Sequence, residues 1–192
     1  MEHFYNKIGE DWMDFQDLYS EMIDHFPDNS HFVEIGSWKG RSAAYMAVEL
    51  INSGKKIKFD CVDTWLGSQE HLEPSSPFFV QELIKDKDWL YYEFLKNIRP
   101  VSDFINPIRM SSLEAVSLYE NRSLDFVFID ASHEYDDVKK DIVAWYPKVK
   151  KGGYLCGHDY TTFDGVRKAV DETIIFNRLN WSLKKSYWIH RK

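Results

Sequence analysis

The segment from Phe32 to Ser42, FVEIGSWKGRS, constrains the fold more than any other part of the chain. A short apolar run contains the acidic Glu34, and two glycines follow four positions apart, at Gly36 and Gly40. An alanine-rich segment with helical character comes next. This order predicts a strand, a tight turn and a helix, the arrangement by which open α/β sheets form a crevice for nucleotides.

The spacing of the two glycines narrows the class of ligand. A dinucleotide fingerprint reads G-x-G-x-x-G, and its second glycine lets the backbone approach a pyrophosphate. Trp38 occupies that position here, which blocks the approach. A phosphate-binding G-x-x-x-x-G-K-[ST] loop needs a longer spacing and a lysine where Arg41 stands. The remaining pattern, E-x-G-x-x-x-G, suits a nucleoside without phosphates.

Length and composition limit the broad class of protein. With 192 residues, we expect one domain over 1–192. A formal charge of −7 argues against nucleic acid as a partner, because phosphate backbones need clustered basic residues. Cys61 and Cys156 lie in apolar runs, which predicts buried thiols rather than a disulfide. The sequence shows no membrane-spanning run and no signal-peptide pattern, so we expect a cytoplasmic protein without membrane contact.

Strand and helix patterns alternate along the chain. They predict an α/β three-layer sandwich, with a mostly parallel sheet, helices on both faces and an antiparallel C-terminal strand. The expected strands are at 31–35, 57–62, 104–108, 124–129 and around 154–156, with two short strands within 181–190. Helices are expected from the glycine turn to Gly54, from Glu134 to Val149, and over 163–176.

Two segments lie outside this alternation. The N-terminal helical segment, 1–30, carries one apolar stripe at helical spacing: Ile8, Trp12, Phe15, Tyr19, Met22 and Phe26. The stripe fits either coverage of the sheet or pairing with a second copy in a homo-oligomer. The insertion at 65–100 is longer than a crossover helix needs and is rich in aromatic residues. It is either an extra helix packed on the sheet or an acceptor lid at the carboxyl ends of the strands.

Several polar residues follow the predicted strands and suit a nucleoside ligand. Glu34 would accept a hydrogen bond from a ligand ammonium, directly or through water, or else would hold a loop. Asp63 ends the second strand, where a carboxylate can accept both ribose hydroxyls. Ser111 and Ser112 follow the third strand, at the expected adenine edge, although either serine would also serve as a helix cap.

A second group of polar residues ends the fourth and fifth strands. Asp130 and Asp159 are expected to converge at one edge of the sheet, where repulsion between carboxylates favours a bound divalent cation such as Mg²⁺. His133 follows on the first turn beyond the strand and suits a general base. The alternative is that both acids sit at helix N-termini. His158 fits three roles, as a proton carrier, a metal ligand or an orienting residue.

Four motifs together resemble the class I methyltransferases that depend on S-adenosylmethionine (SAM), of the compact methyltransferase family 24 type. They are E-I-G-S-W-K-G-R-S from Glu34, V-D-T-W from Val62, F-I-D-A-S-H-E-Y from Phe128 and G-G-Y-L-C-G-H-D-Y from Gly152. They are similar also to metal-dependent sugar O-methyltransferases. The resemblance covers about 32–160 and implies a Rossmann-like fold.

The resemblance implies roles for individual residues. The residues expected to bind SAM are Glu34, Gly36, Ser37, Gly40, Asp63, Ser111, Ser112 and Asp130. In the metal-dependent members it implies Asp130 and Asp159 as metal ligands and His133 as the base. The expected reaction is O-methylation of a hydroxyl on a small molecule or glycan.

Other functions are also compatible with the pattern. One is a SAM-binding module without turnover that acts through a protein partner, although Asp130, His133 and Asp159 are all retained. Another is an NAD-dependent oxidoreductase, which Trp38 in the crevice turn disfavours. Methylation of nucleic acid is disfavoured by the acidic charge and by the lack of an N-P-P-Y motif after the fourth strand.

Overall fold

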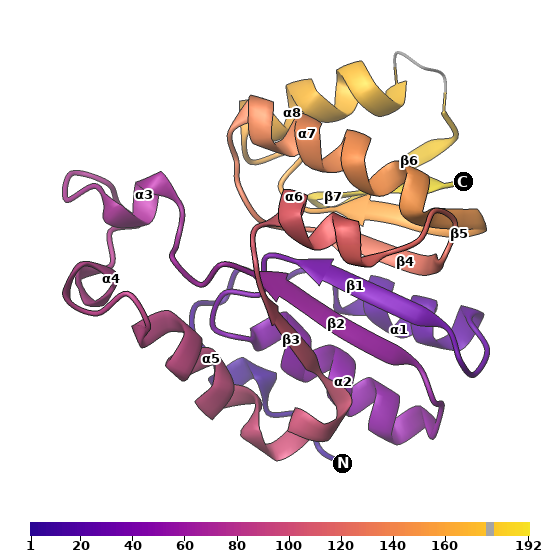
Figure 1. The fold of residues 1–192 in the computed structure, drawn as a ribbon, viewed down its shortest axis with the longest axis horizontal. Coiled ribbons are helices and arrows are strands. Elements are labelled where there is room, and N and C mark those ends of the chain that lie inside the picture. The colour runs from indigo at the N-terminus through magenta and orange to yellow at the C-terminus, as the bar shows by residue number, and fades with distance from the viewer. Residues whose placement is uncertain (176–178) are drawn as a thin grey trace.

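The computed structural model describes residues 1–175 and 179–192, and a seven-stranded sheet forms its centre (Figure 1). The strands are β1 (His31–Ile35), β2 (Lys58–Asp63), β3 (Asn106–Arg109), β4 (Leu124–Ile129), β5 (Val149–Gly157), β6 (Trp181–Lys184) and β7 (Tyr187–Arg191). Their order in the sheet is β3-β2-β1-β4-β5-β7-β6. The first five strands are parallel, and β7 runs antiparallel to β5 and β6. The predicted fold class is confirmed.

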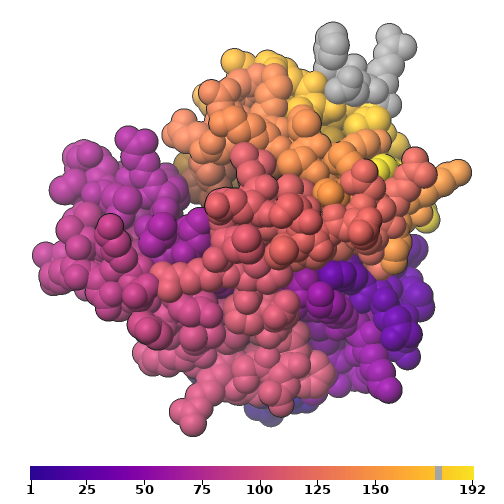
Figure 2. All heavy atoms as spheres, in the orientation of Figure 1, coloured from indigo at the N-terminus to yellow at the C-terminus, as the bar shows by residue number. Residues whose placement is uncertain are grey.

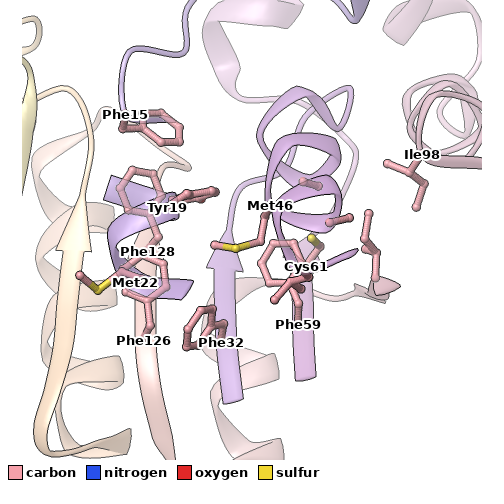
Figure 3. Packing of buried hydrophobic residues seen from close by; sticks show 14 of the residues in the cluster. Phe15, Tyr19, Met22, Phe32, Met46, Phe59, Cys61, Ile98, Phe126 and Phe128 are labelled. Carbon is pink, nitrogen blue, oxygen red and sulfur yellow. The ribbon is translucent and has the colours of Figure 1, made fainter. Parts of the chain in front are cut away.

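Helices cover both faces of the sheet (Figure 1). One face carries α1 (Gln16–His25), α2 (Arg41–Ser53) and α5 (Trp89–Ile98), whose apolar residues share a core with the sheet (Figure 3). The other face carries α6 (Ser112–Ala115), α7 (Tyr135–Trp145) and α8 (Asp164–Val170), with a second core. The strands separate these two cores, so each buried strand is apolar on both sides.

Alternation along β1 decides which core each side chain enters. Phe32 packs in the α1 and α2 core, whereas Val33 and Ile35 pack in the α7 and α8 core. Because successive side chains of a strand point to opposite faces, Glu34 lies on the same face as Phe32. A carboxylate is therefore buried beneath α1, one residue before the end of a mostly apolar strand.

The N-terminal helix is shorter than its apolar stripe predicts. Helix α1 begins at Gln16, and only a short 3-10 turn, Tyr5–Lys7, precedes it. Gly9 has a φ of +56°, a left-handed conformation that ends helical geometry before the stripe can continue. The later stripe residues pack on the sheet, whereas Trp12 is 49% exposed.

Two predicted helix boundaries also differ from the structure. Val149 begins β5 instead of continuing the preceding helix, because α7 ends at Trp145 and Pro147 lies in a 3-10 turn. Helix α8 ends at Val170, and a π-helical segment, Asp171–Ile175, follows it. The predicted helix end at Phe176 lies outside the described residues.

The insertion at 65–100 contains three helices with different surroundings. Helix α5 buries Leu90, Phe94 and Ile98 in the core that it shares with α2, as expected of an extra packed helix. Helices α3 (Gln69–Leu72) and α4 (Gln81–Lys85) instead project beyond the carboxyl ends of β1 and β2 (Figure 1). Figure 2 shows this part as the magenta lobe on the left of the molecule.

Both cysteines are buried free thiols, as predicted. Burial raises the pKa of the Cys61 and Cys156 thiols, so both remain protonated near neutral pH. Among the described residues, no helix combines the length and the apolar composition needed to cross a bilayer.

The fold predicts a large cost for removing the Phe32 ring. Phe32 is fully buried and contacts the rings of Phe26 and Phe126, at centroid distances of 5.6 and 5.3 Å. Phe32→Ala should lower the free energy of unfolding by about 3–5 kcal/mol, because it leaves a cavity between α1 and the sheet. Urea denaturation would measure this. Val143→Ala, at a position 60% exposed, is the control, and equal effects of the two substitutions would contradict the assignment.

Candidate active site

The carboxyl ends of β1 and β4 form the point where the sheet reverses its strand order. From β1 the chain moves outward to β2 and β3, and β4 then returns to pair with β1 on its other side. Loops from neighbouring strands diverge at such a point and leave a crevice, which is where open α/β sheets bind ligands. The glycine turn after β1 and the loop after β4 form its two sides.

Gly36 lets the two sides of the crevice approach each other. Its φ is +87°, and a Cβ atom at this position would lie 2.1 Å from the Asp130 carbonyl oxygen. Gly40 also has a left-handed backbone, with a φ of +86°. A Cβ atom at this position would lie 2.8 Å from the Ile98 side chain of α5. The sequence predicts glycines here for the turn, and the structure adds these two close approaches.

Asp63 holds the glycine turn from the neighbouring strand. Its carboxylate accepts backbone N–H groups of Ser37 at 2.9 Å, Trp38 at 3.0 Å and Trp65 at 2.7 Å. Burial raises the pKa of this carboxyl group, and the three N–H bonds oppose that shift. Its role toward a ribose remains a prediction, because the carboxylate already stabilises the turn itself.

Trp38 adopts a backbone conformation that is costly for a bulky residue. Its φ is +46°, in the left-handed region, where such residues lose about 1–3 kcal/mol. Besides the Asp63 bond, the Trp65 indole donates to the Trp38 carbonyl at 3.0 Å. Strain that surrounding bonds maintain is often found at functional sites, which agrees with the position of Trp38 at the crevice.

Glu34 lies beneath the glycine turn and has a partner from α1. The Tyr19 hydroxyl donates to its carboxylate at 2.6 Å, and the Glu34 side chain is almost completely buried. Burial, with a smaller contribution from the charge of Asp130, raises the pKa of Glu34 to about 7. Nothing in the local sequence indicates the Tyr19 contact, because it depends on how α1 packs across β1.

The two serines after β3 both have protein partners. Ser111 is the N-cap of α6 and forms a capping box with Glu114, the capping role that the sequence left open. The Ser112 hydroxyl donates to Asp141 and accepts from the Trp145 indole. Both hydroxyl groups are therefore already engaged within the protein. The predicted position of the two serines at an adenine edge remains a prediction.

Asp130, His158 and Asp159 come together at the ends of β4 and β5, as the sequence predicts for the two acids. The Nδ1 atom of His158 lies 3.6 Å from Asp130 Oδ1 and 3.4 Å from Asp159 Oδ1. One ligand atom from each of the three residues can be chosen so that all lie within 4.8 Å of one another, close enough to hold one metal ion. Burial opposes a charge on His158, but Asp130 and Asp159 raise its pKa to about 11.

His133 lies between two carboxylates on the other side of this group. Its Nε2 atom is 3.1 Å from Asp159, and its Nδ1 atom is 2.9 Å from Glu70 of α3. The ring stacks on Phe163 at a centroid distance of 3.8 Å. Burial lowers the pKa of His133, but the carboxylates, Asp159 first, outweigh it and raise the pKa. The carboxylates on both sides thus favour the protonated imidazole in this arrangement.

Three polar contacts between distant segments are not predicted by the sequence. His158 Nε2 lies 3.0 Å from Asp14 and 2.8 Å from the Ser186 hydroxyl, which belong to the N-terminal segment and the β6–β7 turn. Glu70 reaches His133 from the insertion. No local motif marks these residues, because the contacts connect segments far apart in the sequence.

The structure also has a cavity away from this edge of the sheet. It has a volume of about 390 Å³ and lies near the amino ends of β2 and β3, with Gly54, Lys55, Phe59 and Asn106 among its lining residues. A smaller pocket coincides with the candidate site and is lined by Asp130, His133, His158 and Asp159, among others. The chemistry of the lining residues, not the cavity size, identifies the site.

Known proteins share sequence similarity with this chain. A methyltransferase domain family matches residues 33–160, which contain both sides of the crevice. The curated relatives include the uncharacterized protein y4gI of Sinorhizobium fredii, 27% identical over 127 residues, which are 66% of this chain and 13% of that protein. Uncharacterized protein R132 of Acanthamoeba polyphaga mimivirus is 27% identical over 142 residues, 71% of this chain and 54% of that protein. The chain thus spans about half or less of these relatives.

Solved structures show the same fold. The O-methyltransferase NovP has a TM-score of 0.68 at 16% identity, over 92% of this chain and 78% of that one. CalS11, a TDP-rhamnose 3′-O-methyltransferase, has a TM-score of 0.60 at 15% identity, over 92% and 77%. An O-methyltransferase from Bacillus cereus, in complex with S-adenosylhomocysteine, has a TM-score of 0.59 at 16% identity, over 93% and 79%.

The buried Glu34 predicts a pH dependence of stability. Its pKa rises from an ordinary 4.5 to about 7 on folding, so the folded protein holds this proton more tightly than the unfolded chain. The resulting stabilisation is complete below pH 4.5 and is lost as the pH rises to about 7. Relative to Glu34→Gln, the free energy of unfolding of the native protein should fall by about 3 kcal/mol over this range. Urea denaturation at several pH values would measure it, and parallel curves would contradict it.

Proposed function

The chain belongs to the methyltransferase domain family, and from this premise we propose that it is a SAM-dependent methyltransferase acting on a hydroxyl group of a small molecule or glycan. The observation that carries the proposal is the crevice itself. A glycine turn lies on one side, and Asp130, His133 and Asp159 gather on the other. A module that only bound SAM would have no need of this second group.

The cofactor would occupy the crevice between the glycine turn and the loop after β4. SAM supplies, when bound, a methyl group on a sulfonium sulfur, which leaves readily as a thioether. Glu34 would attract the ammonium of its amino-acid portion, because a carboxylate lies just beneath the turn. Asp63 would orient the ribose while it holds the turn.

The cluster of Asp130, His158 and Asp159 fits a divalent cation. Two carboxylate oxygens and an imidazole nitrogen form a suitable donor set, and the Asp14 contact at Nε2 directs Nδ1 toward the cluster. The imidazole makes Mn²⁺ as suitable as Mg²⁺, since nitrogen ligands suit transition metals. A bound cation would supply Lewis-acid chemistry by lowering the pKa of an acceptor hydroxyl.

His133 would remove the proton from the acceptor hydroxyl. A base needs one nitrogen free of its own proton, whereas both nitrogens of His133 now face carboxylates. Nε2 would be the basic nitrogen in the absence of its Asp159 contact, and the Glu70 carboxylate, 2.9 Å from Nδ1, lies on the other side of the ring. The acceptor oxygen then bonds to the methyl carbon as the carbon–sulfur bond breaks, and the proton passes to Nε2.

Binding of S-adenosylhomocysteine tests the proposal directly. Calorimetric titration should show binding of S-adenosylhomocysteine both with Mg²⁺ and with EDTA. The reason is that most of the residues proposed to bind the cofactor are not among the proposed metal ligands. Binding only with Mg²⁺ would place the metal against the cofactor. No binding under either condition would contradict the proposed function.

A single substitution separates cofactor binding from turnover. His133→Ala should bind S-adenosylhomocysteine with unchanged affinity, since the imidazole lies on the acceptor side. It should reduce turnover by about 100-fold or more, as expected for loss of a general base. Release of S-adenosylhomocysteine from SAM would measure turnover. Unchanged turnover would contradict the role of His133 as base.

Mn²⁺ binding tests the metal site without any acceptor. Electron paramagnetic resonance of free Mn²⁺ should show that Asp159→Asn weakens binding by at least about 10-fold, because it removes a ligand charge. Asp14→Asn should weaken it by about 10-fold, as when a partner of a metal-binding histidine is lost. Asp164→Asn, at an exposed carboxylate that pairs with Arg167, is the matched control. Equal Mn²⁺ affinity in all variants would contradict the site.

A further inference from the structure

Four aromatic side chains from three separate segments meet beside the proposed active site. They form what we term the aromatic mouth, and they are Trp12, Trp38, His71 and Phe78. Trp12 contacts Trp38 at a centroid distance of 6.3 Å and the Phe78 ring at 6.1 Å, nearly edge to face. His71 stacks on Trp38 at 4.2 Å. Trp12 is 49% exposed and Phe78 36%, so aromatic surface remains open to a ligand.

The aromatic mouth is connected to the reacting groups on both sides. Asp14, two residues after Trp12, contacts His158. Glu70, the residue before His71, contacts His133. A ligand that packed against the exposed rings would therefore lie beside the group that surrounds Asp159.

The charges around the aromatic mouth are unsuited to an anionic ligand. Glu10 accepts from the Trp38 indole, and Asp11, Asp14, Glu70 and Glu73 lie within two residues of Trp12 or His71 in the chain. Three cations that contact these segments are already paired with carboxylates: Lys39 with Glu10, Arg41 with Asp11 and Lys185 with Asp17. A diphosphate or another polyanion would meet repulsion here, with none of these three cations free to bind it.

One polar group beside the aromatic mouth, the Glu10 carboxylate, is already occupied. Glu10 accepts from both the Lys39 ammonium, at 2.6 Å, and the Trp38 indole, at 3.1 Å. A sugar would bury several hydroxyl groups among these rings, and each hydroxyl without a partner costs free energy. A flat ring with one or two hydroxyls needs fewer polar partners and can pack edge to face on Trp12 and Phe78.

We propose that the aromatic mouth is the acceptor subsite and that it selects an uncharged phenolic ring. This inference rests on the proposed methyltransferase activity and gives it a substrate class. The ring packs on Trp12 and Phe78, and its hydroxyl points toward His133. The phenolic oxygen forms a bond to the methyl carbon as the carbon–sulfur bond of SAM breaks, the electron pair stays on sulfur, and the phenolic proton passes to His133.

Three acceptor probes distinguish this class from its alternatives. Catechol represents uncharged phenols, methyl glucoside represents uncharged sugars, and UDP-glucose represents acceptors that carry a diphosphate. Saturation-transfer NMR with the protein, S-adenosylhomocysteine and Mg²⁺ measures binding of each probe. Release of S-adenosylhomocysteine from SAM measures its methylation. We expect catechol to bind and react, and the other two probes to do neither.

Variants of the aromatic mouth test whether the rings bind the acceptor. Trp12→Ala and Phe78→Ala should each raise the KM for catechol about 3- to 10-fold while kcat stays within about 2-fold, the effect of losing one aromatic contact. Tyr92→Ala removes another exposed aromatic ring of the same insertion, outside the aromatic mouth, and should change neither constant. S-adenosylhomocysteine affinity should be unchanged in all three variants.

The outcomes separate this inference from the activity on which it rests. If S-adenosylhomocysteine binds but catechol does not, the acceptor assignment is wrong and the methyltransferase proposal stands. The assignment is also wrong if methyl glucoside or UDP-glucose reacts in place of catechol, or if Tyr92→Ala matches Trp12→Ala. If S-adenosylhomocysteine fails to bind, the proposed function itself is wrong.

Discussion

The close approach of the β1 and β4 loops is the constraint on which the rest of the site depends. Gly36 meets the Asp130 carbonyl so closely that no side chain fits between them. The Asp130 N–H also donates to the Ile35 carbonyl at 2.8 Å. The glycine turn and the acidic loop are therefore two sides of one crevice, which brings the turn proposed to bind the cofactor close to the groups proposed to move a proton.

Charge is concentrated at this edge of the sheet, and the histidines offset it. Asp130 and Asp159 repel each other, and His158 lies between them as a cation, with Asp14 on its other nitrogen. His133 likewise separates Asp159 from Glu70. Burial raises the cost of any unpaired charge, so each carboxylate here has a basic neighbour. A bound cation would replace His158 as the main positive charge among these acids.

Much of the fold follows from local patterns in the sequence. Strand and helix alternation, the glycine turn and the carboxyl-end acids all depend on residues close together in the chain, and the sheet order then brings Asp130 and Asp159 together. The errors arise where tertiary contacts override a periodic pattern. Gly9 interrupts the apolar stripe, and Val149 leaves a helical face to begin β5 because Pro147 ends the helix before it.

The sequence by itself determined the fold class, the crevice and the acids at its edge, because periodicity and turn chemistry are local. Only the tertiary structure decided the partners of those groups. Tyr19 on Glu34, Asp14 on His158 and Glu70 on His133 each join segments that are separate in the chain. The aromatic mouth arises in the same way, from three segments that are separate in the chain. Such contacts depend on how packed elements cross in space, which no local pattern records.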